Sequence, residues 1–189
     1  MYGILGESRS DVDTLKALVR RIAANEFLSI KAKGYEGCGE MLRKGATQLQ
    51  LFAKLGCSQF IVCYDSDGKD PVERRKTVDD QIVKPSRTSQ PCCIVVPVQE
   101  LEAWILADIE CAQRVFDSWN PMPISNPEAI ASPKEHLEKL SRATNRRPRY
   151  HHATHNERMA KYMDIEKVHK ACPSFRPLFE FVQAAERGR

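Results

Sequence analysis

An apolar run that ends in two carboxylates restricts the fold of this chain more than any other feature. Residues 60–63, Phe-Ile-Val-Cys, form the run, and Asp65 and Asp67 follow it one residue apart. A run with little polar alternation predicts a strand buried on both faces, as in a parallel sheet flanked by helices. Such sheets bind ligands at the carboxyl ends of their strands. Because residues i and i+2 of a strand share a side, we expect both carboxylates to converge on one site.

Two interpretations of this segment remain open at the level of sequence. Carboxylate oxygens suit Mg²⁺ or Mn²⁺, which would make Asp65 and Asp67 metal ligands. The alternative is a polar loop between a strand and a helix, in which Asp67-Gly68 forms a turn and Asp70-Pro71 caps the next helix. A second acidic site elsewhere in the chain would favour the metal.

The amino terminus supplies such a site. The first predicted strand runs directly into Glu7, and a helix is predicted over 11–25 because apolar residues recur there at the spacing of one buried face. Ser10 followed by Asp13 resembles an acidic variant of a capping box. Asp11 is either a first-turn carboxylate stabilised by the helix dipole or a further metal ligand. Glu7 precedes the cap, where a parallel sheet would present it beside the other two acids.

A third pair of acids follows another predicted strand, 94–98. Glu100 and Glu102 open a helix that is predicted to reach Asp108, with Trp104 in the core. These acids either stabilise the amino end of that helix through its dipole or belong to the metal site. Acids thus follow three strands, at what a parallel arrangement makes one edge of the sheet, and this favours a shared site.

The alternation of strands and helices predicts an α/β fold with a mostly parallel, Rossmann-like sheet flanked by helices. We expect a core over 1–110 and a helical extension over 111–189 packed on it, since 189 residues are too few for two ordinary domains. Gly56 is expected to end one helix, and Ser132 to cap another. The other predicted elements are strands at 1–5 and 27–32 and helical segments at 40–55, 69–83, 132–142 and about 159–182.

The composition predicts a soluble globular protein, with 42% hydrophobic and 29% charged residues. No apolar stretch approaches the roughly 20 residues that cross a bilayer, so we expect no membrane span. The amino terminus lacks the pattern of a signal peptide. Seven cysteines, an odd number with no CxxC pair, fit a reducing compartment. We therefore expect a cytoplasmic protein with free thiols.

Basic residues collect between positions 142 and 161, around Tyr150. Such a segment can follow a phosphate backbone, although most runs of charge are only solvated surface. A zinc site of His151, His152 and His155 lacks a fourth local donor and is disfavoured. The candidate contacts to phosphate or nucleic acid are Lys69, Arg74, Arg146, Arg147, Arg149 and His151.

Three segments together resemble the Toprim arrangement, in which a glutamate follows the first strand and a DxD motif follows a later one. They are Gly6-Glu7, Asp65-Ser66-Asp67-Gly68 and Glu100-Leu101-Glu102-Ala103-Trp104. Topoisomerases, primases and OLD-type (overcoming lysogenization defect) nucleases carry this arrangement. The chain is more closely similar to a bacterial Toprim-like family of unknown function, whose members also have a C-terminal Ser-Phe element, here Ser174-Phe175.

The resemblance implies a Mg²⁺-dependent, nuclease-like site of Glu7, Asp65 and Asp67, acting beside a partner ATPase in bacterial defence against phage. In that chemistry the metal stabilises charge on a phosphodiester oxygen and activates water, while Glu7 binds a second metal or acts as general acid or base. The chain departs from the family pattern at Ser8, where a second glycine is usual, and at 151–155, where histidines replace lysines.

Two other functions remain open. A small phosphohydrolase of the haloacid-dehalogenase type would use Asp65 as a nucleophile, but Lys69 stands where that motif has threonine or valine. A binding module with the same fold would keep the acids and dock an ATPase partner through its C-terminal helices. An EF-hand is excluded, because Lys69 occupies a ligand position and no late glutamate stands at the required spacing. The sequence does not set the oligomeric state.

Overall fold

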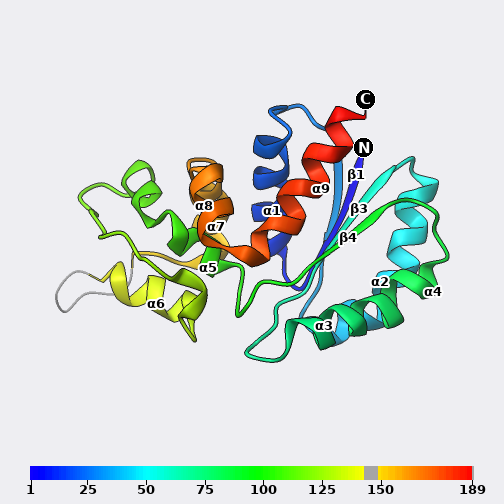
Figure 1. The fold of residues 1–189 in the computed structure, drawn as a ribbon, viewed down its shortest axis with the longest axis horizontal. Coiled ribbons are helices and arrows are strands. Elements are labelled where there is room, and N and C mark those ends of the chain that lie inside the picture. The colour runs from blue at the N-terminus through cyan, green and yellow to red at the C-terminus, as the bar shows by residue number, and fades with distance from the viewer. Residues whose placement is uncertain (143–148, 189) are drawn as a thin grey trace.

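Four parallel strands form the centre of the molecule (Figure 1). The computed structural model describes residues 1–142 and 149–188. Each neighbouring pair in the sheet is parallel, and the order is β2-β1-β3-β4, which confirms the predicted α/β, Rossmann-like fold. Within the described residues the strands are β1 (Tyr2–Gly6), β2 (Ile30–Gly34), β3 (Gln59–Cys63) and β4 (Cys92–Val95).

Two strands lie a few residues from their predicted positions. The strand predicted at 27–32 is β2, which starts only at Ile30 because Phe27 lies in a turn and is 95% exposed. The strand predicted at 94–98 is β4, which ends two residues before Pro97. Proline cannot donate a hydrogen bond to a strand ladder, and this limits the strand at that end.

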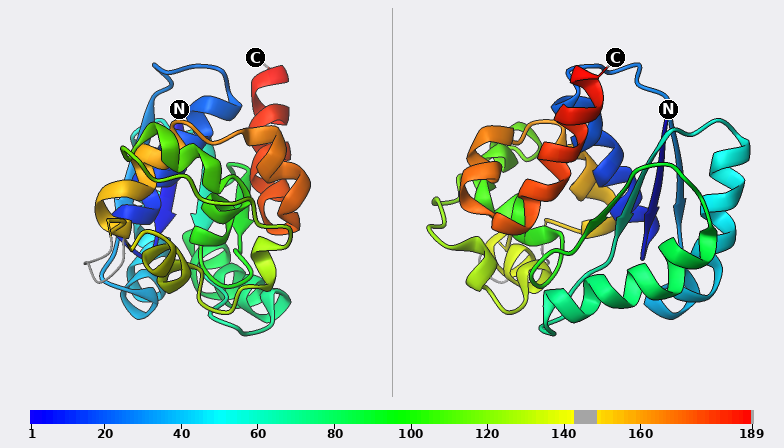
Figure 2. Two further views of the ribbon diagram at one scale, coloured as in Figure 1. Left: turned by 90° about the vertical axis from the view of Figure 1, so that its left-hand side faces the viewer. Right: turned by 45° about the vertical axis from the view of Figure 1, so that its right-hand side comes forward.

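Helices cover both faces of the sheet (Figure 2). One face packs against α1 (Arg9–Ile22) and α9 (Arg176–Arg187), and the other against α2 (Cys38–Lys54) and the segment that begins with α3 (Pro71–Val78). The buried apolar side chains form two clusters, one on each face. Because successive strand residues point to opposite faces, neighbouring residues of β1 belong to different clusters.

The first helix begins earlier than predicted because Ser8 caps it. The Asp11 backbone N–H donates to Ser8 Oγ at 3.2 Å, and the Ser8 N–H donates to Asp11 Oδ2 at 2.8 Å. This pair forms a reciprocal capping box. The predicted pair of Ser10 and Asp13 is therefore wrong: Ser10 Oγ donates to the His152 carbonyl at 3.1 Å, and Asp13 forms ion pairs along the helix surface.

Three short helices replace the single helix predicted at 69–83. They are α3, a π-helix η1 (Asp79–Val83) and α4 (Lys84–Ser86). Asp70 caps α3, since its Oδ1 accepts the backbone N–H of Val72 in the first turn at 2.8 Å, as the loop interpretation predicts. Pro85 lacks the N–H that would continue an α-helical hydrogen-bond ladder. The π-helix η1 precedes this proline, and α4 ends one residue after it.

The remaining described residues are helical with breaks, as predicted (Figure 1). The helix predicted at 132–142 is α6, and the segment predicted at 159–182 is divided at Asp164, which caps α8, and at Pro173. These elements are α5 (Glu102–Ala107), η2 (Ile109–Arg114), η3 (Pro127–Ala129), α6 (Pro133–Leu140), α7 (His152–Ala160), α8 (Ile165–Ala171) and η4 (Pro173–Phe175).

The later helices share a hydrophobic core with α1. The hydrophobic cluster on the α1 face of the sheet contains Leu15 of α1 together with Trp104, Met159 and Val182 from later helices. The division into a core over 1–110 and an extension over 111–189 stays a prediction. The motif at 100–104 and the C-terminal Ser-Phe element are in contact, since Trp104 Nε1 donates to Ser174 Oγ at 2.8 Å. No helix within 1–142 or 149–188 is both long and apolar enough to cross a membrane.

Candidate metal centre at the carboxyl edge of the sheet

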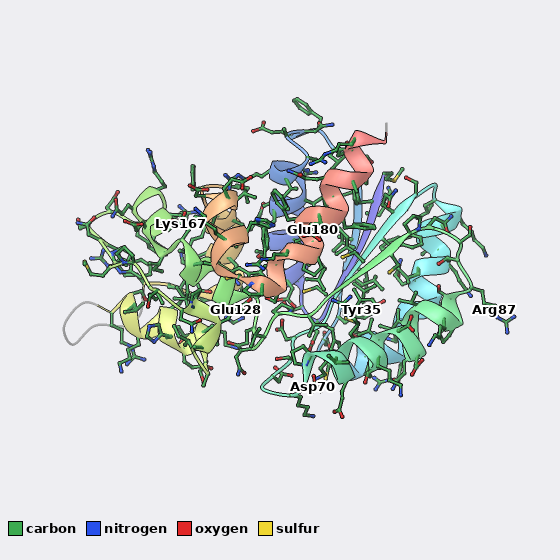
Figure 3. The ribbon with its side chains drawn as sticks, in the orientation of Figure 1. Tyr35, Asp70, Arg87, Glu128, Lys167 and Glu180 are labelled. Carbon is green, nitrogen blue, oxygen red and sulfur yellow. The ribbon has the colours of Figure 1, made fainter. Side chains whose placement is uncertain are left out.

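The carboxyl ends of β1 and β3 lie side by side at the point where the strand order reverses. The chain crosses from β1 to β2 on one side, and later places β3 on the other side of β1. Parallel sheets bind ligands in the crevice at such a switch point. Glu7 directly follows β1, and Asp65 comes two residues after β3. Asp70, at the start of α3, marks this edge of the sheet in Figure 3.

Glu7 and Asp65 are in direct contact. Glu7 Oε1 accepts the backbone N–H of Asp65 at 2.8 Å, so the carboxylate that follows the first strand reaches across to the third. Both residues are partly buried. The structure therefore brings together the two acids that the sequence placed after separate strands.

Asp67 is more exposed and interacts with a cation on the next helix. Its φ is 49° and that of Gly68 is 73°, which gives the predicted turn. Arg74 Nη2 lies 3.3 Å from Asp67 Oδ2, and Arg74 also donates to the Ser66 carbonyl at 3.1 Å and to the Tyr64 hydroxyl at 2.9 Å. Arg74 therefore holds the loop and partly neutralises Asp67, and its contact to phosphate stays a prediction.

Negative charge at this edge is poorly balanced around Glu7 and Asp65. Burial raises the pKa of Glu7 to about 7; the hydrogen bond from the Asp65 N–H and the charge of Arg74 oppose this, and Asp67 and Asp11 add to it. Burial also raises the pKa of Asp65 well above its usual range, with further contributions from Asp11, Glu7 and Glu102. In the described part of the chain, no Lys or Arg lies within ion-pair distance of Glu7 or Asp65. The site therefore favours the uptake of positive charge.

Asp11 and Glu100, which the sequence left open as metal ligands or helix-end acids, both act at helix ends. Asp11 closes the capping box of α1. Glu100 Oε2 accepts the Lys134 backbone N–H at 3.1 Å, and Glu100 Oε1 lies 3.3 Å from Lys134 Nζ. Ser132 stands at the N-cap of α6, but its side chain makes no capping bond. The predicted helix start at Ser132 is therefore confirmed, but its side-chain cap is wrong, because a carboxylate 34 residues away serves the same N-terminus.

Glu102 belongs to a buried polar network. It is 6% exposed, and its Oε1 accepts the side-chain N–H of Asn156 at 2.9 Å, while Asn156 Oδ1 accepts the hydroxyl of Tyr150. Burial raises the pKa of Glu102 to about 7, and the bond from Asn156 opposes this shift. Sequence analysis missed Asn156. Its spacing three residues before Met159 was the available signal, since it places a polar side chain on the buried face of α7.

The predicted basic contacts are spread over the molecule. Lys69 is exposed in the loop after the turn that contains Asp67. Arg149 and His151 are also exposed, and Arg149 Nη1 donates to a backbone carbonyl at 2.6 Å. Arg146 and Arg147 lie outside the described residues.

The donor set suits a hard divalent cation in its chemistry, although the side chains do not enclose one as they stand. Glu7, Asp65 and Asp67 supply carboxylate oxygens and excess negative charge, which Mg²⁺ and Mn²⁺ prefer. Over the described ranges, no three His, Cys, Asp or Glu side chains are gathered closely enough to hold an ion. Glu7 is turned toward a backbone N–H and Asp67 toward Arg74. Cation binding therefore requires at least one of these contacts to open.

Comparison with known proteins identifies a family but not an activity. The model of a family described as Domain of unknown function (DUF4276) matches residues 7–183, so the chain belongs to this family. The matched span begins at Glu7 and contains every candidate ligand. No curated protein and no solved structure matches the chain.

Proposed function

We propose that this member of the DUF4276 family binds Mg²⁺ or Mn²⁺ through Asp65, Asp67 and Glu7 and hydrolyses a phosphodiester bond, as a nuclease of Toprim type. The poorly balanced carboxylates at the carboxyl edge carry the proposal, because a divalent cation would remove their mutual repulsion. Buried acids with a structural role are normally paired, as Asp108 is with Lys167 Nζ at 2.9 Å.

Each candidate residue has a distinct task in this proposal. Asp65 and Asp67 hold the cation, which supplies charge stabilisation at a phosphate oxygen and an activated water. Glu7 either binds a second metal ion or acts as general acid or base near neutral pH, since burial raises its pKa to about 7 in the metal-free protein. Arg74 fixes the loop through the Ser66 carbonyl and Asp67, and so sets the position of that second carboxylate.

One observation favours a second function, a binding module without catalysis. The carboxylates do not enclose a cation as they stand, because Glu7 and Asp67 have other partners. A module of this kind would use the same fold to dock another protein. The resemblance to OLD-type proteins makes an ATPase of a phage-defence system the partner to test.

Cleavage assays with matched variants test the proposed nuclease. Labelled single- and double-stranded DNA and RNA are incubated with Mg²⁺ or Mn²⁺ and with wild type, Asp65→Asn or Glu7→Gln. Glu26→Gln is the control, since Glu26 is exposed in the loop before β2, at the opposite edge of the sheet. We expect metal-dependent cleavage that is on the order of 100-fold slower in the first two variants and unchanged in the control.

The other outcomes distinguish the alternatives. Metal binding that requires Asp65, without cleavage of any substrate, would support the binding module. Hydrolysis of p-nitrophenyl phosphate but of no nucleic acid would indicate a small phosphohydrolase. Metal binding and cleavage that are both indifferent to Asp65→Asn would contradict the assignment of this site.

A further inference from the structure

A basic surface lies beside the acidic edge, on the outer side of α2 and on strand β2. The segment 31–54 contains five cations and only two acids, Glu36 and Glu40. We use the name α2 surface for its five cations, which are Lys31, Lys33, Arg43, Lys44 and Lys54. All five are exposed.

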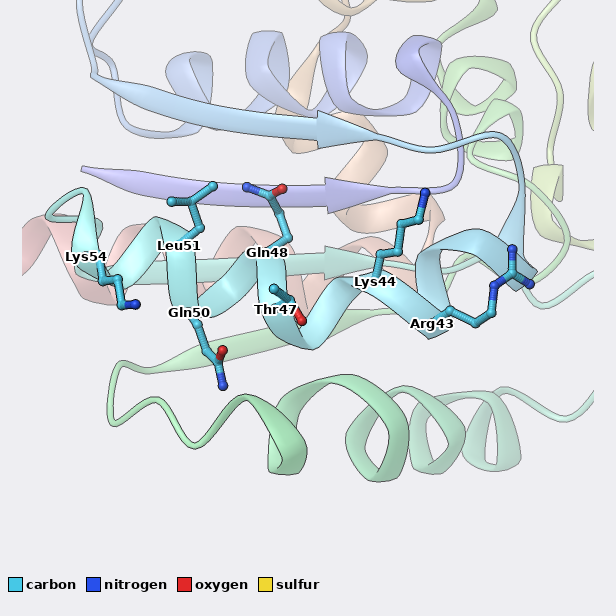
Figure 4. A pocket seen from close by; sticks show the side chains of 7 residues that line it. All are labelled: Arg43, Lys44, Thr47, Gln48, Gln50, Leu51 and Lys54. Atoms are coloured by element: carbon cyan, nitrogen blue, oxygen red, sulfur yellow. The ribbon is translucent and has the colours of Figure 1, made fainter.

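The outer face of α2 has a shallow hollow of about 450 Å³. Figure 4 shows Arg43 and Lys54 toward its two ends, with Lys44, Thr47 and Gln48 between them. Three uncharged hydrogen-bonding side chains lie between the cations, those of Thr47, Gln48 and Gln50. The hollow therefore combines positive charge with hydrogen-bonding side chains along a single helix.

Strand β2 extends the α2 surface beyond the helix. It is the edge strand of the sheet, and Lys33 Nζ lies 5.6 Å from the ring centroid of Tyr35, whose side chain belongs to the core cluster under α2. Lys44 Nζ pairs with Glu40 Oε1 at 2.5 Å, and Lys33 also contributes to lowering the pKa of Glu40. Lys33 of the strand and Lys44 of the helix therefore flank one carboxylate, which makes the surface continuous.

Most cations of the α2 surface have no acidic partner. Among residues 1–142 and 149–188, no carboxylate lies within ion-pair distance of Lys31, Lys33, Arg43 or Lys54. Two cations near α7 are engaged in contrast, since Arg149 donates to a backbone carbonyl and Lys161 pairs with Glu157 at 2.8 Å, although Arg158 has no carboxylate within ion-pair distance among the described residues. The α2 surface therefore has more charge available for an anionic ligand.

The α2 surface begins at the rim of the acidic site. The Gly37 N–H, just before α2, donates to the Glu7 carbonyl at 2.9 Å. Gly34, at the end of β2, packs so closely on Ser8 that an added Cβ would lie 2.5 Å from the Ser8 carbonyl oxygen. A chain that follows β2 and α2 toward this end therefore arrives at the loop that carries Glu7.

We infer that the α2 surface binds the phosphate backbone of a nucleic acid and leads it to the acidic site, an inference that rests on the proposed phosphodiester hydrolysis. The 17 residues of α2 span about 25 Å, the length of about seven phosphates along one strand of a duplex. Cations contact the phosphates, and the hydroxyl and amide side chains add hydrogen bonds. Exposed lysines on an edge strand oppose pairing with a second copy of the chain.

Binding without cleavage tests this inference. Fluorescence anisotropy measures a labelled 20-nucleotide single strand and its duplex in EDTA, in an Asp65→Asn background, at 50 to 300 mM salt. The test variant is Lys31→Gln/Lys33→Gln/Arg43→Gln, and the control is Lys76→Gln/Lys139→Gln/Lys170→Gln, three exposed lysines on α3, α6 and α8. Thermal melting verifies that both triple variants are folded.

We expect the test variant to bind at least about tenfold more weakly at low salt and to lower the slope of log affinity against log salt by about two to three. The control keeps both values. We also expect an 8-nucleotide strand to bind better than a 4-nucleotide strand, because the shorter one spans about half of α2.

Several outcomes would overturn the inference. They are equal weakening in both triple variants, binding of anionic lipid vesicles but not of nucleic acid, and weakening only in Arg149→Gln/Arg158→Gln, which would place the backbone on α7. Because this experiment requires no cleavage, it remains decisive if the nuclease proposal fails. Cleavage by the wild type in the separate assay, together with unchanged binding in the test variant, would overturn the inference while leaving that proposal intact.

Discussion

Two acids of this protein, the partly buried Asp65 at the carboxyl edge and the buried Asp108 after α5, have opposite surroundings. Asp108 accepts the Asp164 N–H at 2.8 Å and pairs with Lys167 Nζ at 2.9 Å. Asp65 has other carboxylates around it, and no described Lys or Arg reaches ion-pair distance. The comparison teaches that burial alone does not distinguish these two acids, whereas the balance of charge around each of them does.

The largest loss of stability is expected at Glu102, which, unlike Asp65, accepts a hydrogen bond from a buried side chain. Asn156→Ala removes the donor to the Glu102 carboxylate and the acceptor of Tyr150, and both groups then stay buried without that partner. We expect a loss of about 2–4 kcal/mol in the free energy of unfolding, measured with urea. Asn120→Ala, at an exposed position, is the control and should change it little. A loss below about 0.5 kcal/mol would show that the network contributes nothing.

A pH titration sharpens the comparison at Glu102. Its pKa is about 7 in the folded chain and 4.5 ordinarily, so between these values the unfolded chain has released the proton that the folded chain retains. Folded wild type therefore loses stability relative to Glu102→Gln as pH rises from 5 to 8, without metal. The difference in unfolding free energy should grow by up to about 3 kcal/mol. A difference that stays constant or shrinks over this range would refute the shift.

Opposite signs are expected when each of the two compared acids is neutralised. Asp108→Asn weakens the pairing to Lys167 and should lower the free energy of unfolding by about 1–3 kcal/mol. Asp65→Asn removes a poorly balanced, partly buried carboxylate and should raise the free energy of unfolding by about 1 kcal/mol without metal, roughly 2–4 °C in Tm. Differential scanning calorimetry in EDTA measures both. Destabilisation by both variants would remove the distinction between these acids.

The sheet was predictable because its signals are local. The apolar run 60–63 and the acids that follow it predict a buried strand and a ligand edge, and the structure places Glu7 beside Asp65 as parallel strands require. The predictions that were wrong concern the ends of helices and strands. A cap can come from distant residues, as Glu100 replaces Ser132 at α6, and no local spacing reveals that contact.

The partners of each acid were not predictable, because they come from distant parts of the chain. Asn156 lies 54 residues from Glu102, and Lys167 lies 59 residues from Asp108. Sequence spacing cannot decide which acids receive such partners and which do not. The α2 surface was not predicted either, because apolar residues separate its cations in the sequence. These cations gather only when β2 and α2 lie side by side.

The most direct test of the account is titration of the metal-free protein with Mn²⁺, followed by electron paramagnetic resonance near pH 7.5. The samples are wild type, Asp65→Asn and Asp108→Asn. The account predicts binding by wild type and Asp108→Asn, and an affinity at least about tenfold weaker in Asp65→Asn. Equal Mn²⁺ affinity in wild type and Asp65→Asn would contradict the claim that the carboxyl edge of the sheet is a metal site.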